Sequence, residues 1–132
     1  MIFFPFVDVF AVFVGSVIVD IEPAYYLFFT NMGPYHGFLH TYLGCTILSF
    51  LLALGSYPLK HFYLKLLRLF GLEQEVSLRK TLGSYLLGSY FHVFLDSFLY
   101  PEMKPFYPFG GNPLLYTIYY MDCLLYTSDA AD

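Results

Sequence analysis

The sequence predicts an all-α fold, a polytopic transmembrane helical bundle, and three observations lead to that class. First, 58% of the 132 residues are hydrophobic and only 12% are charged, whereas typical globular domains carry about 25% charged residues. Second, apolar runs recur at the length of a membrane-crossing helix. Third, the net charge of −4 gives no basic patch of the kind that nucleic-acid-binding modules need. A soluble domain, a disordered tail and a nucleic-acid partner are therefore not expected.

Three stretches are predicted to span the bilayer, and a fourth is begun but cut short. Ile2 to Val19 is the first, and it lacks the basic start and the cleavage site of a signal peptide. Phe38 to Tyr57 is the second and contains no Asp, Glu, Lys or Arg. Thr81 to Tyr100 is the third. The run LLYTIYYMD after Pro113 is typical of the opening of a fourth span.

Residues 1–122 are expected to form a single membrane-embedded helical domain. The tail from Cys123 to Asp132, CLLYTSDAAD, is polar where the preceding run is apolar, and it resembles the translation of an adapter sequence used in library preparation. We interpret this tail as non-native and the natural chain as cut near Asp122. A genuine short C-terminus is the alternative. Without the tail, Cys45 is the only cysteine, so no intrachain disulfide is expected.

The connector at 58–80 sets the predicted orientation. Five of the six basic residues lie in it, and an excess of Lys and Arg in a short loop marks the cytoplasmic side of a membrane. Within the connector, His61 to Leu72 (HFYLKLLRLFGL) is typical of a short amphipathic helix in the membrane interface or of an ordinary solvated hairpin tip. With the connector inside, the first span ends outside, the second begins outside and the third ends outside.

Ionisable residues gather near those three outer ends. His36 and His40 are four positions apart in HGFLH, as are His92 and Asp96 in HVFLD, and residues at i and i+4 share one face of a helix. Charged groups within a bilayer are costly and need partners. Imidazole and carboxylate are usual ligands of Zn²⁺, and a carboxylate-rich set also admits Mn²⁺ or Fe. The candidates for one metal site are Asp20, Glu22, His36, His40, His92 and Asp96.

Two further motifs bear on packing and on the surroundings of that site. Pro101 to Pro113 (PEMKPFYPFGGNP) is too rich in Pro and Gly for a regular helix. As a loop it either caps the polar site, with Lys104 or Asn112 contacting substrate, or anchors the chain at the interface. Gly83 and Gly88, with Ser84 and Ser89, are small residues in the third span that are predicted to permit close helix packing.

Three of these motifs, taken together, resemble one known family. VIVDIEP (Val17 to Pro23), HGFLHT (His36 to Thr41) and HVFLDSFLYPEMKPFYPF (His92 to Phe109) are similar, in this order, to the membrane-bound metal-dependent hydrolase family. Its bacterial members are described as inner-membrane-associated, LexA-binding hydrolases, and the similarity is greatest to archaeal members. The resemblance spans Val17 to Pro113. Relatives carry a His in a T-P-F-H-like stretch before the first span, where this sequence has MIFFPF.

The resemblance implies hydrolysis of a substrate by a water that a bound divalent metal, Zn²⁺ first, activates. In that scheme Glu22 is the expected general base, and the expected ligands are Asp20, His36, His40, His92 and Asp96. We expect a multi-pass protein of the cell membrane, with the 58–80 connector cytoplasmic and the site toward the outer face. The lipid bilayer is the expected partner, and an amphiphilic substrate arriving along it is the expected substrate class. The alternative is non-enzymatic, either an ion- or proton-handling protein or a structural membrane protein.

Overall fold

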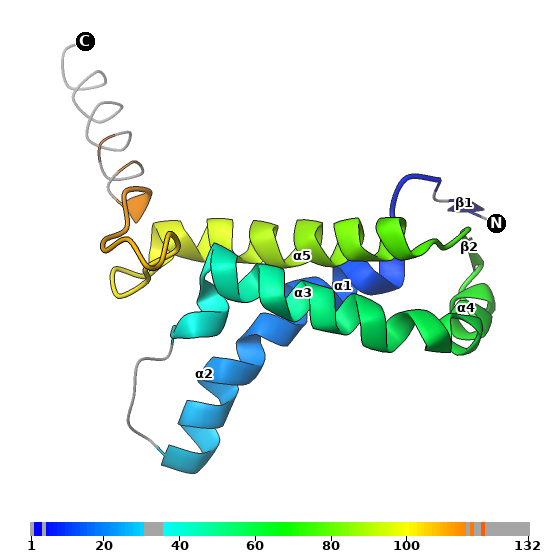
Figure 1. Cartoon of the computed structure of the whole chain (residues 1–132), viewed down its shortest axis with the longest axis horizontal. Helices are drawn as coiled ribbons and strands as arrows, with labels where there is room; N and C mark the ends of the chain where they lie inside the picture. Colours follow the sequence, from blue (N-terminus) through cyan, green and yellow to red (C-terminus); the bar gives the residue numbers. More distant parts are fainter. Residues whose placement is uncertain (1, 4, 31–35, 116, 118–119, 121–132) are drawn as a thin grey trace, which may run out of the picture.

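The structure, a computed structural model, describes residues 2–3, 5–30, 36–115, 117 and 120. Its long helices are α1 (Val9–Val17), α3 (Tyr42–Ser56) and α5 (Leu78–Leu99), and α5 packs against both of the others (Figure 1). The strands β1 (Ile2–Phe3) and β2 (Leu72–Glu73) form one short parallel pair. Helices dominate the described residues, so the predicted all-α class is confirmed.

The first helical run begins at Val9, and the predicted start at Ile2 is wrong. Asp8 supplies the reason: its backbone is extended and its side chain accepts a hydrogen bond from the amide of Ala11 at 3.3 Å. A carboxylate in this position satisfies one of the amides that the first turn leaves free, which starts the helix there.

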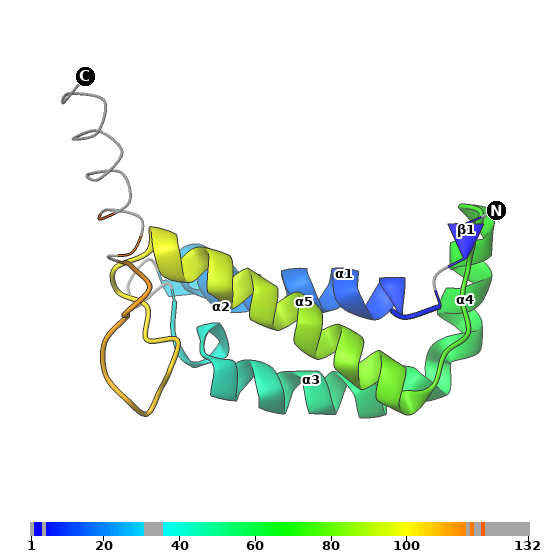
Figure 2. The ribbon, with the colours of Figure 1, turned by 90° about the horizontal axis from the view of Figure 1, so that it is seen from above.

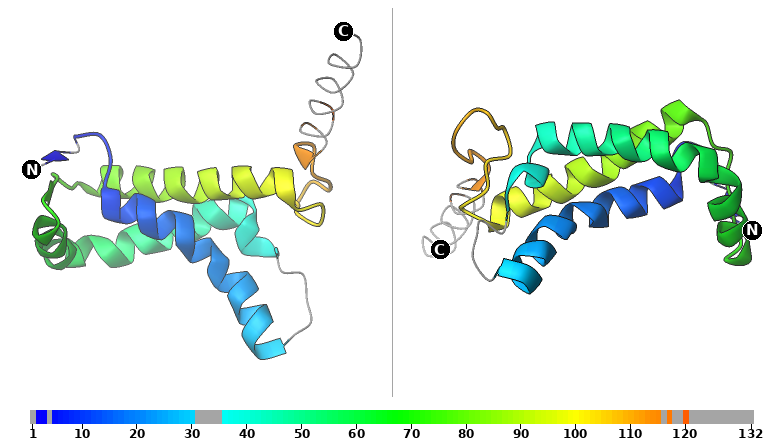
Figure 3. Two further views of the ribbon diagram at one scale, coloured as in Figure 1. Left: turned by 180° about the vertical axis from the view of Figure 1, so that it is seen from behind. Right: turned by 60° about the horizontal axis from the view of Figure 1, so that its bottom comes forward.

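The same run bends at the motif DIEP, Asp20 to Pro23. After α1 the chain tightens into the 3-10 turn η1 (Ile18–Asp20), continues as α2 (Ile21–Tyr25), and ends in the π-helical segment η2 (Tyr26–Thr30). Pro23 lies in the first turn of α2, where a proline is tolerated. Seen from behind the view of Figure 1, α2 turns away from the direction of α1 (Figure 3). The bend leaves Asp20 at the end of the straight part.

The second helical run begins four residues later than the predicted Phe38. Phe38–His40 instead forms a separate 3-10 turn, η3, and Thr41 caps α3 by accepting a hydrogen bond from the amide of Gly44 at 2.9 Å. Beyond α3 the run continues through the 3-10 turn η4 (Tyr57–Leu59) into α4 (Lys60–Leu69). This last helix lies across the end of the bundle (Figure 2).

Two helical runs of the described residues are long and apolar enough to cross a membrane. They are Val9–Thr30, with 22 residues, and Tyr42–Leu69, with 28 residues. The third predicted span is helical, since it lies in α5, but α5 is less apolar than these two runs and is not apolar enough to count as a membrane-crossing helix by the same measure. The number of spans therefore stays a prediction. The fourth predicted span lies largely outside the described residues, and the tail at 123–132 lies wholly outside them.

Helices α1 and α5 approach each other at a pair of glycines. A Cβ atom built on Gly88 would lie 2.3 Å from the carbonyl oxygen of Val12, and one built on Gly15 would lie 2.7 Å from that of Tyr85. Both distances are shorter than real Cβ contacts, so only glycine allows this approach. Close packing was predicted at Gly88, and the geometry there confirms it. A Cβ atom built on Gly83 would meet no atom within 4 Å, so the prediction of close packing is wrong for that position.

The order of the helices gives the bundle two distinct ends. The chain enters α1 and α5 from the end that α4 crosses, and it enters α3 from the other end. A buried cluster of Ala11, Ala53 and Tyr85 fills the half near α4. A second buried cluster fills the opposite half, directly beneath the candidate site, and consists of Val19, Cys45, Val93 and Met103.

Candidate metal centre

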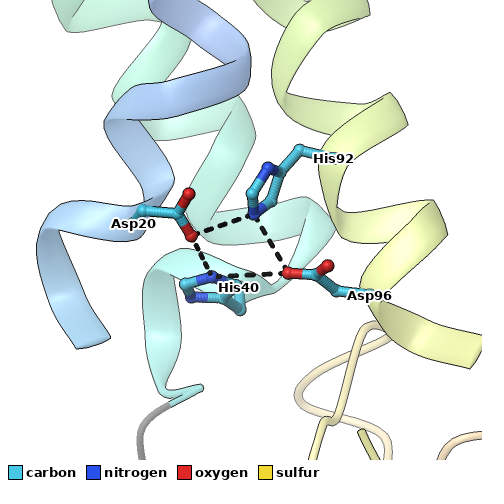
Figure 4. Close-up of side chains that lie close together, drawn as sticks. All are labelled: Asp20, His40, His92 and Asp96. Atoms are coloured by element: carbon cyan, nitrogen blue, oxygen red, sulfur yellow. Dashed lines mark ion pairs between the residues drawn. The ribbon is translucent and has the colours of Figure 1, made fainter. Parts of the chain in front are cut away.

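Four ionisable side chains converge at the end of the bundle opposite α4. Asp20 comes from the bend after α1, His40 from the turn before α3, and His92 and Asp96 from the last turns of α5 (Figure 4). Each offers one ligand atom, and the four atoms lie within 4.8 Å of one another. Three segments that are far apart in the sequence thus supply one cluster.

Within the cluster, each imidazole nitrogen lies close to two carboxylate oxygens. His92 Nε2 lies 3.2 Å from Asp20 Oδ1 and 3.0 Å from Asp96 Oδ2. His40 Nε2 lies 3.6 Å and 3.9 Å from the same two oxygens. Both Nε2 atoms are buried, and neither has a hydrogen-bond partner among the described residues. Leaving a buried nitrogen unsatisfied costs about 1–3 kcal/mol, so this arrangement calls for a further ligand.

A divalent cation fits this arrangement in both geometry and charge. Tetrahedral Zn²⁺ with bonds of about 2.0–2.2 Å holds neighbouring ligand atoms roughly 3.4 Å apart. The four N–O separations span 3.0 to 3.9 Å, and all four ligand atoms lie within 4.8 Å of one another. Two aspartates supply two negative charges, and neutral imidazole is the form of His that binds metals. Burial, the largest influence on His40, lowers the pKa of its imidazole and so favours that neutral form.

Glu22 lies on the other side of His40 from the cluster. One oxygen of its carboxylate, Oε2, lies 3.4 Å from His40 Nδ1 and accepts a hydrogen bond from the amide of Leu39 at 3.0 Å. Gly37 makes room for this carboxylate, because a Cβ there would lie 2.5 Å from Glu22 Oε1. With Nδ1 facing a carboxylate, the Nε2 lone pair of His40 is left to point into the cluster. Such a carboxylate–imidazole pair fixes the orientation and tautomer of a metal-binding His.

His36 lies beside the cluster and is paired with a residue that sequence reasoning missed. Its Nδ1 is 3.0 Å from Glu102 Oε1, and its ring lies against the Tyr100 ring with a centroid distance of 4.0 Å. The ring also meets that of His40 edge-on at 4.8 Å. A backbone hydrogen bond first, and His36 in addition, hold the pKa of the Glu102 carboxyl below its usual value. Glu102 lies two residues after the end of the third predicted span, in PEMKP, and this position near the outer end of the span is the signal that could have identified it.

A cavity of about 550 Å³ opens in front of the cluster. Asp20 and Asp96 form part of its wall, together with His36 and Glu102, while Leu27 and Phe28 supply an apolar side. Asp20 is half-exposed and gives the cluster its access to this space. Glu22 does not line the cavity. A site that is buried at His40 and open at Asp20 can hold an ion and still admit a substrate.

The loop after α5 is fastened to both neighbouring helices. The amide of Tyr42 donates to the carbonyl of Pro105 at 2.9 Å, and Met103 is buried in the cluster beneath the site. Asn112 donates from Nδ2 to the carbonyl of Ser97 at 2.7 Å and to that of Tyr100 at 3.3 Å. This amide therefore caps the end of α5. Lys104 instead lines a second cavity of about 340 Å³, on the other side of His36 and Glu102.

The six residues singled out from the sequence thus fall into two groups. Asp20, His40, His92 and Asp96 form the cluster, at the shared end predicted from the order and direction of the helical segments. Glu22 and His36 stand beside it, each next to the ring of His40. The ligand role of His36 and the base role of Glu22 stay predictions.

Comparisons with protein-family models, with curated proteins and with solved structures find no match to this chain. The geometry of the cluster is therefore the main basis for a proposed function.

Proposed function

We propose that this chain is a membrane-embedded, metal-dependent hydrolase whose catalytic centre is the Asp20–His40–His92–Asp96 cluster. One observation carries the proposal: two buried imidazole nitrogens, on His40 and His92, have no hydrogen-bond partner among the described residues and lie next to the carboxylates of Asp20 and Asp96. A purely structural ion pair would align each nitrogen with an oxygen for a hydrogen bond, which these nitrogens do not do. The resemblance of the sequence motifs to the membrane-bound metal-dependent hydrolases supports the same proposal.

Each residue has a distinct part in this scheme. The four cluster residues hold the ion, with Zn²⁺ expected first and Mn²⁺ or Fe as alternatives. A divalent ion held by these residues would supply a coordinated water with a pKa lowered toward about 7 and a positive charge beside a substrate oxygen. Glu22 orients His40. His36 and Glu102 line the cavity beside Asp20, so they are the groups placed to exchange protons with a substrate there.

An amphiphile is the substrate class that the surroundings favour. An apolar hollow of about 410 Å³ runs along one side of α1 and α2, and its lining includes Phe13, Val17 and Ile21. It shares Asp20 and Ala24 with the cavity in front of the cluster. An apolar chain lying in the hollow would bring an attached polar group to Asp20. Such a substrate could arrive along the bilayer that the two apolar helical runs are proposed to cross.

Metal content measures the core of the proposal directly. The purified full chain, in detergent, is expected to retain a divalent ion that elemental mass spectrometry detects. His40→Ala and His92→Ala each remove a buried ligand and should lower the retained metal at least tenfold. His61→Ala is the matched control, because His61 is exposed on α4 at the other end of the bundle. Equal metal content in all four proteins would refute the metal site.

A second candidate, proton or cation handling, has an observation of its own. Buried polar side chains occur at several depths on α5, among them Thr81, Ser84 and Ser89, and a buried carboxylate, Asp8, lies at the α4 end. Membrane proteins use such groups in proton relays. The full chain in sealed vesicles with an internal pH dye separates the two functions. A proton flux that Asp8→Asn stops would favour handling, whereas the hydrolase requires no flux.

A further inference from the structure

Helix α4 presents three different faces around its axis. Tyr63 is buried and faces the bundle. Phe62, Leu66 and Leu69 recur at the spacing of one helical stripe and are 77%, 48% and 79% exposed. Leu59 and Phe70 extend this exposed apolar stripe at the two ends of the helix. An exposed stripe of this kind on a helix that is otherwise attached to the protein requires a partner.

Basic residues line the remaining edge of the stripe. Lys65 and Arg68 are both exposed and three positions apart, so they follow the helix along the side away from Tyr63. The 58–80 connector carries five basic residues and, in Glu73 and Glu75, two acidic ones. An apolar stripe bordered by cations matches a surface that is apolar in depth and anionic at its edge.

A buried hydrogen-bond network holds α4 in place. Tyr63 donates its hydroxyl to Asp8 Oδ2 at 3.0 Å, and its ring stacks on Phe10 of α1 at a centroid distance of 4.4 Å. Asp8 also accepts hydrogen bonds from Gln74 at 2.8 Å and from Thr81 at 2.9 Å. The network thereby ties α4 to α1, to the segment after α4 and to α5. The exposed stripe has a fixed direction.

That direction fits a bilayer surface. Helices α1, α3 and α5 run along the length of the bundle, while α4 lies across its end (Figure 2). If the long helices cross the membrane, α4 lies in the membrane plane at the level of the headgroups. We infer that α4 binds the anionic headgroup layer of a phospholipid leaflet, with its apolar stripe in the acyl boundary and Lys65 and Arg68 on the headgroups. This inference rests on the membrane location proposed above, but not on the metal site.

The chain contains no Trp, so one introduced Trp is a clean reporter of depth. Phe62→Trp in α4 and Phe50→Trp on the exposed side of α3 are compared in nanodiscs that contain brominated lipids. Bromine near the headgroups should quench the Trp at 62, and bromine deep in the acyl chains should quench the Trp at 50. If only the Trp at 62 is quenched by iodide from the water, α4 is not in the interface and the membrane crossing stands. If iodide quenches the Trp at both positions, the proposed membrane location is wrong.

Lipid retention tests the preference for anionic headgroups. The full chain is purified from nanodiscs of phosphatidylcholine mixed with phosphatidylglycerol, and the lipid that stays bound is measured by mass spectrometry. The double variant Lys65→Gln/Arg68→Gln should retain less phosphatidylglycerol, by about fivefold for each charge removed. Lys104→Gln is the matched control, because it removes one charge at the other end. Equal retention by the double variant and the parent would overturn the anionic preference.

Discussion

An alanine at position 88 tests whether the contact between α1 and α5 sets the geometry of the metal site. The two helices meet at Gly88, where a Cβ would lie 2.3 Å from the carbonyl oxygen of Val12 and 2.9 Å from the amide nitrogen of Ser16. Both atoms belong to the backbone, so neither can rotate away. Gly88→Ala must therefore push the helices apart.

The size of the displacement follows from these distances. Ordinary van der Waals contact needs about 1 Å more than the 2.3 Å available. Asp20 follows α1 and His92 lies on α5, so a similar displacement reaches their Oδ1–Nε2 separation of 3.2 Å. Metal ligands must be held to within about 0.5 Å. Overpacking costs about 1–3 kcal/mol, and we expect Gly88→Ala to weaken metal binding about 10- to 100-fold.

Competition titration of the purified protein with a chelating dye gives that affinity. Gly83→Ala is the matched control, since it lies on the same helix and its Cβ would meet no atom within 4 Å. It should bind metal as the parent does. Circular dichroism should show the same helix content in all three proteins, which separates displacement from unfolding. An unchanged affinity in folded Gly88→Ala would refute the idea that this contact positions the ligands.

Two further predictions concern carboxylates outside the cluster. Glu22→Ala should weaken metal binding at least tenfold in the same titration, because His40 loses the group that orients it. Glu22→Gln should keep part of the affinity. If Glu22→Ala binds metal as the parent does, Glu22 does not orient His40 and stays free for the base role. Asp8→Ala should lower the free energy of unfolding by about 3 kcal/mol or more in denaturant titration, since buried donors including Tyr63 lose their acceptor. An unchanged free energy of unfolding would contradict a structural role for the network.

The sequence was sufficient to predict most of the cluster. Spacing of four placed His92 and Asp96 on one helical face, and both contribute ligand atoms. Chain direction placed Asp20 and His40 at the same end, because successive membrane spans run in opposite directions. The costs of burying ionisable groups then favoured one shared site. These inferences use only helical periodicity and the order of the segments, which a sequence contains.

Roles within the site depended on directions that a sequence does not contain. His36 and His40 share the spacing of His92 and Asp96. The chain at Phe38–His40, however, forms a 3-10 turn that follows the non-helical Gly37, so the two imidazoles do not act as one helical pair. Glu22 is two residues from Asp20 but faces Nδ1 of His40 instead of the cavity. Glu102 was overlooked because its importance arises only from its contact with His36.

The starts of the helices and the contacts of the glycines also depended on hydrogen bonds and packing that the sequence pattern does not contain. Capping by Asp8 and Thr41 moved the first two helices to later starts than hydrophobicity alone predicted, because a cap depends on a local hydrogen bond. Gly83 and Gly88 look equivalent in the sequence, and only the crossing point of α1 and α5 distinguishes them. The sequence by itself determined a helical, apolar chain with its candidate metal-binding residues at one end. Tertiary structure decided which of those groups meet, because side-chain direction follows from how whole helices pack.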